Sequence, residues 1–166
     1  MTTDPQNELL TEVDEANKVI GPIPRGVAHQ SGKYYRTIYV MVRDSQGRVL
    51  LQKRSATKDL YPNCLDLSVG GHVEWGSSYL ETAVRELKEE LGLTVDSQDL
   101  KFLKEVLVTL PQSHEYFHVF EYWLKPGDKL VLATAEVADI SWVTPDELKS
   151  LDFYPRPAQI IRALYS

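Results

Sequence analysis

The segment from Ser78 to Gly92 constrains the fold most, because it has the features of one complete helix with both ends marked. Apolar residues recur at helical spacing along Tyr79–Leu91, at positions 80, 83, 84, 87 and 91. Ser78 followed by Glu81 matches a capping box, and Gly92 stands where a helix commonly ends. We therefore predict an amphipathic helix over Tyr79–Leu91 that packs one face against a core.

The rest of the chain is rich in strand-forming segments. Runs bounded by turn residues predict strands at Leu9–Asp14, Lys18–Arg25, Thr37–Arg43, Arg48–Arg54, Leu65–Val69, Lys101–Leu110, Tyr116–Leu124 and Val137–Val143. The first two are expected to form an N-terminal hairpin over residues 8–26, with Pro22 and Pro24 placing its second strand at an edge. Residues 26–34 and the pair at 70 and 71 are expected to be loop. Helices are expected near Pro145–Leu151 and over Pro157–Tyr165, so the chain is predicted to be a mixed α/β domain.

Length and composition narrow the class of protein. The chain has 166 residues, 43% of them apolar, which suits one domain over residues 1–166 with residues 1–7 disordered. The single cysteine, Cys64, excludes a disulfide framework. The sequence has no signal peptide and no apolar run near the roughly 20 residues that span a bilayer, so we expect a cytoplasmic protein without a membrane partner. A net charge of −6 argues against a nucleic-acid partner, and a phosphorylated substrate would need a local cation.

The predicted helix carries an acidic cluster beside its apolar face. Glu86, Glu89 and Glu90 are spaced i, i+3 and i+4, so their side chains share one face. Such carboxylates repel one another, whereas a Mg²⁺ ion, which prefers carboxylate oxygens, would make the cluster favourable. The glycine pair ending at Gly71 would let a backbone carbonyl reach the same ion, and Arg85 can orient a carboxylate one turn away. On spacing alone, an ordinary solvated helix face stays an alternative.

The wider segment resembles the Nudix box, G-x5-E-x7-R-E-U-x-E-E-x-G-U, in which U is apolar. Eight of the nine fixed positions match, at Gly71, Arg85, Glu86, Leu87, Glu89, Glu90, Gly92 and Leu93. The mismatch is Ser77, where the family usually has a glutamate that supports the loop and the arginine. The resemblance continues in the W-V-T-P-D-E-L segment over Trp142–Leu148. It implies a Nudix-type α/β/α sandwich around a mixed β-sheet.

The resemblance also implies a chemistry, the metal-dependent hydrolysis of a diphosphate linkage in a nucleoside di- or triphosphate or a related nucleotide. It assigns Mg²⁺ or Mn²⁺ to Glu86, Glu89 and Glu90, with the Gly71 carbonyl assisting. Glu89 or Glu136 would then remove the proton of the attacking water.

Further side chains are candidates for binding the small phosphorylated substrate. Arg54 and Lys53 lie at a strand end before the box, where a cation could clamp a phosphate. Trp75 lies in the loop between Gly71 and the helix, where its ring could stack on a base. Arg85 is expected to orient a catalytic carboxylate.

Two other functions stay open at this point. The N-terminal half, including His29 and His72, resembles isopentenyl-diphosphate isomerases, which share the fold but need a cysteine where this chain has Gly70. A non-catalytic nucleotide-sensing module would keep the same pocket without turnover. The N-terminal hairpin also offers an edge at which a homodimer could form.

Overall fold

Strand β3 (Tyr34–Arg43) is the central strand of the molecule in a computed structural model that describes residues 2 and 4–166. It pairs antiparallel with β1 (Leu9–Val13) and with β6 (Val69–His72). It pairs parallel with β8 (Ser113–Trp123) along its whole length. Because both orientations meet on one strand, the sheet is mixed, as predicted.

The other strands extend this sheet to nine strands within the described residues. Strand β2 (Val19–Pro24) pairs with β1, β7 (Lys101–Leu110) pairs with β8, and β4 (Val49–Arg54) pairs with β5 (Leu65–Leu67) and β9 (Val137–Val143). The helices are α1 (Arg25–Ala28), α2 (Tyr79–Leu91), α3 (Pro145–Ser150) and α4 (Pro155–Tyr165), with a 3-10 turn at Ser97–Asp99. The predicted hairpin is therefore present as β1 and β2, with β2 at the edge of the sheet.

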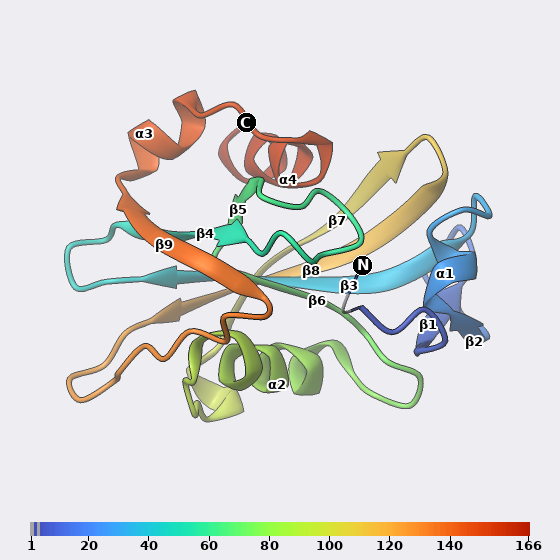
Figure 1. The fold of residues 1–166 in the computed structure, drawn as a ribbon, viewed down its shortest axis with the longest axis horizontal. Coiled ribbons are helices and arrows are strands. Elements are labelled where there is room, and N and C mark those ends of the chain that lie inside the picture. Colours follow the sequence, from blue (N-terminus) through green and yellow to red (C-terminus); the bar gives the residue numbers. More distant parts are fainter. Residues whose placement is uncertain (1, 3) are drawn as a thin grey trace.

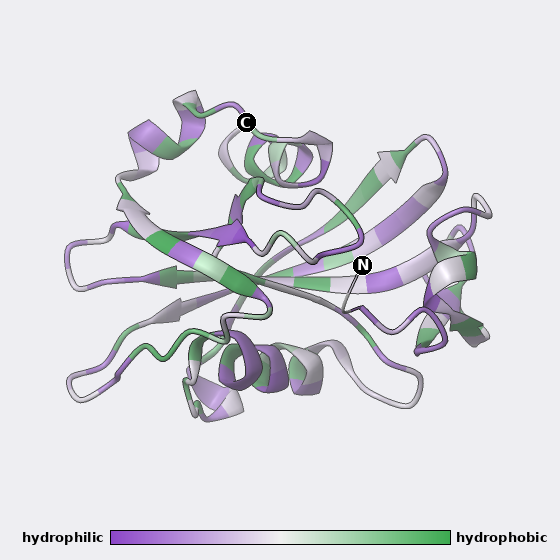
Figure 2. Cartoon of the chain, in the orientation of Figure 1, coloured by the Kyte–Doolittle hydropathy of each residue, from purple (hydrophilic) through white to green (hydrophobic). Residues whose placement is uncertain are grey.

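The helices cover the sheet on both sides (Figure 1). Helix α2 lies on one face, and α3 and α4 lie on the other. Figure 2 shows hydrophilic and hydrophobic residues interleaved along α2 and α4, as expected for helices with one buried face. The buried residues Ile160 and Ile161 of α4 belong to one hydrophobic cluster, and Leu87 and Leu91 of α2 belong to another. This is the predicted α/β/α sandwich.

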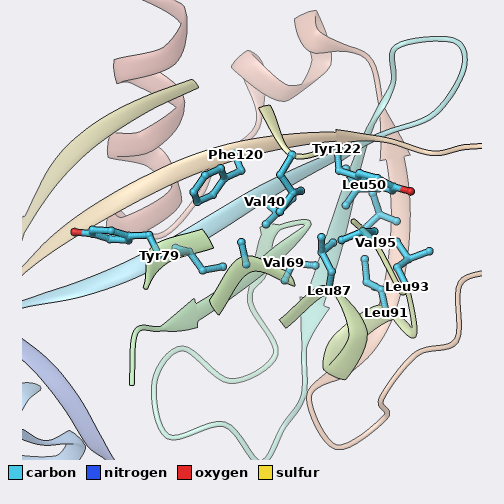
Figure 3. Close-up of a cluster of buried hydrophobic side chains, with 14 of the residues drawn as sticks. Val40, Leu50, Val69, Tyr79, Leu87, Leu91, Leu93, Val95, Phe120 and Tyr122 are labelled. Atoms are coloured by element: carbon cyan, nitrogen blue, oxygen red, sulfur yellow. The ribbon is translucent and has the colours of Figure 1, made fainter. Parts of the chain in front are cut away.

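Helix α2 begins and ends where its sequence predicts. The Ser78 hydroxyl accepts a hydrogen bond from the Glu81 amide at 3.1 Å, and the Glu81 carboxylate accepts one from the Ser78 amide at 2.8 Å. Gly92 follows with a φ of 68°, the left-handed conformation that favours glycine at a helix end. Leu87 and Leu91 point into the core between α2 and the sheet (Figure 3). The apolar stripe thereby sets the direction in which the neighbouring glutamates face.

The strand predicted over Leu65–Val69 is wrong in its boundaries. It is interrupted at Ser68, whose hydroxyl donates to the Leu50 carbonyl at 2.6 Å and accepts from the Val42 amide at 2.8 Å. The buried hydroxyl thus joins β3 and β4 where these strands diverge. Gly70 and Gly71, predicted as loop, lie instead in β6, opposite Tyr39 and Ile38 of β3.

The predictions for residues 26–34 and for the N-terminus also need correction. Residues 26–28, predicted as the start of a loop, belong instead to the short helix α1. Asp4, expected to be disordered, is only 6% exposed and accepts a hydrogen bond from Lys58 at 2.6 Å. Local sequence could not reveal this order, because it comes from contacts with residues more than 50 positions away. Met1 and Thr3, which belong to the same prediction, lie outside the described residues. Among residues 2 and 4–166, no helix is both long and apolar enough to cross a membrane.

Candidate active site

A cavity of about 310 Å³ lies where α2, β3, β6 and the N-terminal segment meet. Its charged lining comprises Asp4, Glu8, Arg25, Arg54, Lys58, Asp59, Asp66, Glu74, Arg85, Glu86, Glu89, Glu90, Glu136 and Arg156. Among these described residues nine are acidic and five are basic. The excess of negative charge would attract a cation to the cavity.

One wall of the cavity unites the acidic residues of α2 with the glycines of β6. The Glu90 carboxylate accepts a hydrogen bond from the Gly70 amide at 3.1 Å. The Glu86 side chain fills the space beside Gly71, where a Cβ would overlap its carboxylate. Glu89 is exposed at the mouth of the same cavity. The structure therefore brings together the four residues that the sequence assigned to a metal.

The electrostatics of this wall suit a cation. Burial, with further contributions from the Glu89 and Glu136 carboxylates, raises the pKa of Glu86 to about 8 despite the opposing charge of Arg85. Burial also raises the pKa of Glu90, with the Glu86 carboxylate adding to the effect. A bound cation would offset this cost of holding negative charge out of water.

The oxygen donors along this wall are of the kind that Mg²⁺ prefers. Within the described residues, no three His, Cys, Asp or Glu side chains already form a metal-ligand set. The donor atoms nevertheless fit Mg²⁺, because carboxylate and backbone carbonyl oxygens share one wall and this ion usually completes its shell with water. The exposed Glu89 has the freedom to move toward such an ion.

Arg85 lines the cavity beside these glutamates and orients one of them. Its guanidinium pairs with the Glu86 carboxylate at 3.1 Å and also contacts the Glu74 carboxylate. The usual glutamate of the box is absent at Ser77, and Glu74 provides an acidic partner for the arginine instead. Sequence reasoning missed Glu74, although its position three residues before the mismatch was a usable signal.

Glu136 lines the cavity but is already paired. Its carboxylate contacts the Lys58 ammonium at 2.6 Å, and Lys58 also contacts Asp4 at 2.6 Å. The side chains of Lys58 and Asp4 are 10% and 3% exposed, so their ion pair is shielded from bulk solvent, whereas the Glu136 side chain is 36% exposed. Lys58 was missed from the sequence, because it lies in a loop with no motif and its partners are 54 and 78 residues away.

The three predicted substrate-binding residues have different positions. Arg54 lines the cavity, but its guanidinium is held by the Asp66 carboxylate at 3.2 Å and by the Leu60 carbonyl at 2.9 Å. Lys53 is exposed and does not line the cavity. Trp75 is 46% exposed and also lies outside the lining. Of the predicted substrate-binding group, the structure places only Arg54 at the cavity.

The N-terminal wall of the cavity is held by a buried cation. The Arg25 guanidinium contacts Asp59 at 3.1 Å, Glu8 at 3.2 Å and Asp4 at 3.4 Å. Burial acts to raise the pKa of Asp59, but hydrogen bonds and charge from Arg25 outweigh it and hold that pKa well below its usual value. The pair therefore ties the loop containing Asp59 to the N-terminal segment.

The low pKa of Asp59 predicts a pH-dependent contribution to stability. The Asp59→Asn variant is expected to lose about 1–3 kcal/mol of unfolding free energy at pH 7, because a charged hydrogen bond is removed. A carboxylate with a depressed folded-state pKa stabilises the protein above its unfolded pKa, about 3.9, and loses that effect as pH falls further. The difference between wild type and variant should therefore shrink below about pH 4 in urea unfolding curves. A difference that stays constant from pH 7 to pH 3 would contradict this assignment.

Comparison with known proteins shows which family the chain resembles. Residues 33–164 match the NUDIX domain family model. The chain is 44% identical over 86 residues to an uncharacterized Nudix hydrolase of Streptomyces coelicolor, an alignment covering 52% of this chain and 48% of that relative. The chain thus spans about half the length of that relative. It is 30% identical over 142 residues to a Nudix hydrolase of Deinococcus radiodurans, covering 86% of this chain and 82% of that one.

A solved structure extends the similarity to nearly the whole chain. The crystal structure of DR0079 from Deinococcus radiodurans superposes with a TM-score of 0.80 at 28% identity. The superposition covers 96% of this chain and 100% of that one. The arrangement of sheet and helices is therefore shared over nearly all described residues.

Proposed function

Because the chain belongs to the Nudix domain family and is similar to Nudix hydrolases, we propose that it is a Mg²⁺-dependent pyrophosphohydrolase of a nucleoside di- or triphosphate or a related nucleotide. The observation that carries the proposal is the shared wall of the cavity. There Glu86, Glu89 and Glu90 lie beside Gly71, which lacks the Cβ that would displace Glu86. Mn²⁺ is expected to substitute for Mg²⁺, since both accept the same oxygen donors.

The residues that would hold the metal are Glu86, Glu89, Glu90 and the Gly71 carbonyl. When bound, the ion supplies Lewis-acid polarisation of the phosphate oxygens and lowers the pKa of a bound water. Arg85 keeps the Glu86 carboxylate in place through the 3.1 Å ion pair.

Proton removal from water is the step that this chain must perform with its own side chains. Glu89 is exposed at the cavity and its side chain has no hydrogen bond or ion pair within the described residues, so a carboxylate oxygen not engaged by the metal can accept a proton. Glu136 is paired with Lys58 at 2.6 Å, so its carboxylate is less available to a water molecule. The water oxygen forms a bond to phosphorus as the bond from phosphorus to the bridging oxygen breaks. The proton passes to the carboxylate, and two phosphate products leave.

The size of the cavity favours a small substrate. Its volume of about 310 Å³ is at the lower end of the range of roughly 300–1,000 Å³ for small-molecule pockets. A mononucleotide with a diphosphate fits that range better than a dinucleotide. We therefore favour nucleoside di- or triphosphates among the compounds that contain the linkage.

The isomerase alternative receives no support from the cavity. The position of the required cysteine is Gly70, and a side chain there would collide with the Tyr39 ring, because its Cβ would lie 2.7 Å from Cε1. Cys64 does not line the cavity. Neither residue can place a thiol beside the acidic wall.

The proposal is tested by turnover of a defined panel. Purified protein is incubated with nucleoside diphosphates, nucleoside triphosphates, a nucleotide sugar, a dinucleotide and isopentenyl diphosphate, with Mg²⁺ or with EDTA. We expect mass spectrometry to find a nucleoside monophosphate formed with Mg²⁺ and absent with EDTA. Absence of any cleavage, with isopentenyl diphosphate isomerised or with a nucleotide bound but unchanged, would reject the hydrolase in favour of the isomerase or the sensor.

A further inference from the structure

The five cations that line the cavity differ in how many of their donors are occupied. Arg25 contacts three carboxylates, Lys58 and Arg85 each contact two, and Arg54 is bonded to a carboxylate and a carbonyl. Arg156 contacts a single carboxylate, that of Glu115. It is therefore the cation of the described lining with the most capacity for a ligand.

The bonding of Arg156 leaves one entire amino group for a ligand. Its Nε and Nη2 donate to Glu115 Oε1 at 3.2 Å and 2.5 Å. Within the described residues Nη1 makes no hydrogen bond, and it is not fully buried. Nη1 is therefore accessible, on a side chain that is only 7% exposed and that lines the cavity.

If the Arg156–Glu115 pair served only to stabilise the fold, the free energy needed to bury its charges would be hard to recover. Glu115 has no exposed side-chain surface, and removing both charges from water costs several kcal/mol per ion before their attraction is counted. Well-packed apolar residues often stabilise such a position equally well. A role in ligand binding accounts for a guanidinium held rigidly at this position.

Arg156 lines the cavity together with two aromatic and two aliphatic side chains. The Tyr39 and Phe117 side chains both line the cavity, and their rings stack with centroids 4.8 Å apart. The Tyr39 hydroxyl donates to Asp66 at 2.7 Å, which fixes the orientation of its ring. Leu60 is partly exposed and adds apolar surface to the lining, whereas Ile38, Tyr39 and Phe117 are buried and support it from behind.

We infer that Arg156 recognises the nucleobase of the substrate by donating from Nη1 to a ring carbonyl oxygen. The inference rests on the proposed function and names the substrate class, nucleotides whose base carries a carbonyl group. Uracil, cytosine, thymine and guanine have such an oxygen, whereas adenine has none. The enzyme is therefore expected to discriminate against adenine nucleotides.

The charge balance of the cavity favours a carbonyl oxygen over a phosphate group of the substrate as the partner of Arg156. The charge of Arg156 is already neutralised by Glu115, and that of the neighbouring Arg54 by Asp66. A phosphate group bound at Arg156 would add uncompensated negative charge to a cavity that already has an excess of carboxylates. A neutral carbonyl accepts the free N–H groups without that cost.

The test compares bases and an Arg156→Lys variant, which keeps the charge but loses the guanidinium. For wild type we expect kcat/KM for UDP and GDP to exceed that for ADP by about 10-fold or more, because an analogue without the acceptor leaves a donor unpaired. Arg156→Lys should reduce this ratio to within about threefold. Arg162→Lys is the matched control, because Arg162 is an exposed arginine on the same helix that does not line the cavity.

Binding without turnover keeps this test separate from the proposed hydrolysis. In EDTA, calorimetry with UMP and AMP should show tighter binding of UMP to wild type, and equal binding of both to Arg156→Lys. If no diphosphate is cleaved but this binding difference is found, the hydrolase proposal fails and the role of Arg156 stands. Equal use or equal binding of adenine and uracil nucleotides by wild type, or a preference unchanged in Arg156→Lys, would overturn the role of Arg156.

Discussion

The Glu89→Gln variant is expected to lower kcat for nucleotide hydrolysis by about 10²–10⁴-fold, the usual contribution of a general base. Glutamine has nearly the same size but neither the charge nor the basicity of the carboxylate. Glu89 is exposed and has no hydrogen bond or ion pair within the described residues, so the unfolding free energy should change by less than about 0.5 kcal/mol. Steady-state kinetics with Mg²⁺ and urea unfolding would measure both quantities.

A neighbouring residue supplies the control for this loss of activity. Lys88→Gln removes a charge from the same turn of α2 at another exposed position that does not line the cavity, and it should leave kcat within about threefold. Glu136→Gln should cost less than Glu89→Gln, because Glu136 is already paired with Lys58. The reverse order would make Glu136 the base and would require Lys58 to leave it during turnover.

The Glu115→Ala variant is expected to lose about 3–5 kcal/mol of unfolding free energy. The change removes the single carboxylate that contacts Arg156 and leaves a guanidinium buried and unpaired. It also takes away the acceptor of a 3.3 Å hydrogen bond from Thr37. Urea unfolding at neutral pH would measure the loss.

A double variant separates the unpaired charge from other effects of the same substitution. Glu115→Leu combined with Arg156→Met removes both charges and keeps apolar volume, so it should recover most of the stability lost in Glu115→Ala. A Glu115→Ala protein within about 1 kcal/mol of wild type would show that water already solvates the Arg156 side chain. That result would also weaken the picture of a rigid guanidinium in the cavity.

Local sequence patterns are informative where neighbouring residues decide the structure. The helix over Tyr79–Leu91 could be predicted to its ends, because capping box, apolar stripe and terminal glycine all act within one or two turns. The strands Lys101–Leu110 and Val137–Val143 were likewise predicted with their observed bounds. The boundary at Ser68 could not be predicted, because its hydroxyl is bonded to two strands that lie far from it in sequence.

The candidate site likewise has one part that local sequence predicts and another that it does not. The acidic residues of α2 and the glycine beside them belong to one motif, so the sequence by itself determined this wall, together with the family and its expected chemistry. Other parts of the cavity come from Asp4, Lys58 and Arg156, which are distributed along the chain, and Arg156 is held there by the buried Glu115. Lys58 pairs with Asp4 and with Glu136, and Arg156 pairs with Glu115, over separations of 41 to 78 residues, and no local pattern encodes such pairings. Only the tertiary structure decided that Glu136 is paired, that Trp75 and Lys53 lie outside the cavity, and that Arg156 lies within it, because packing of the sheet and helices brings these distant segments together.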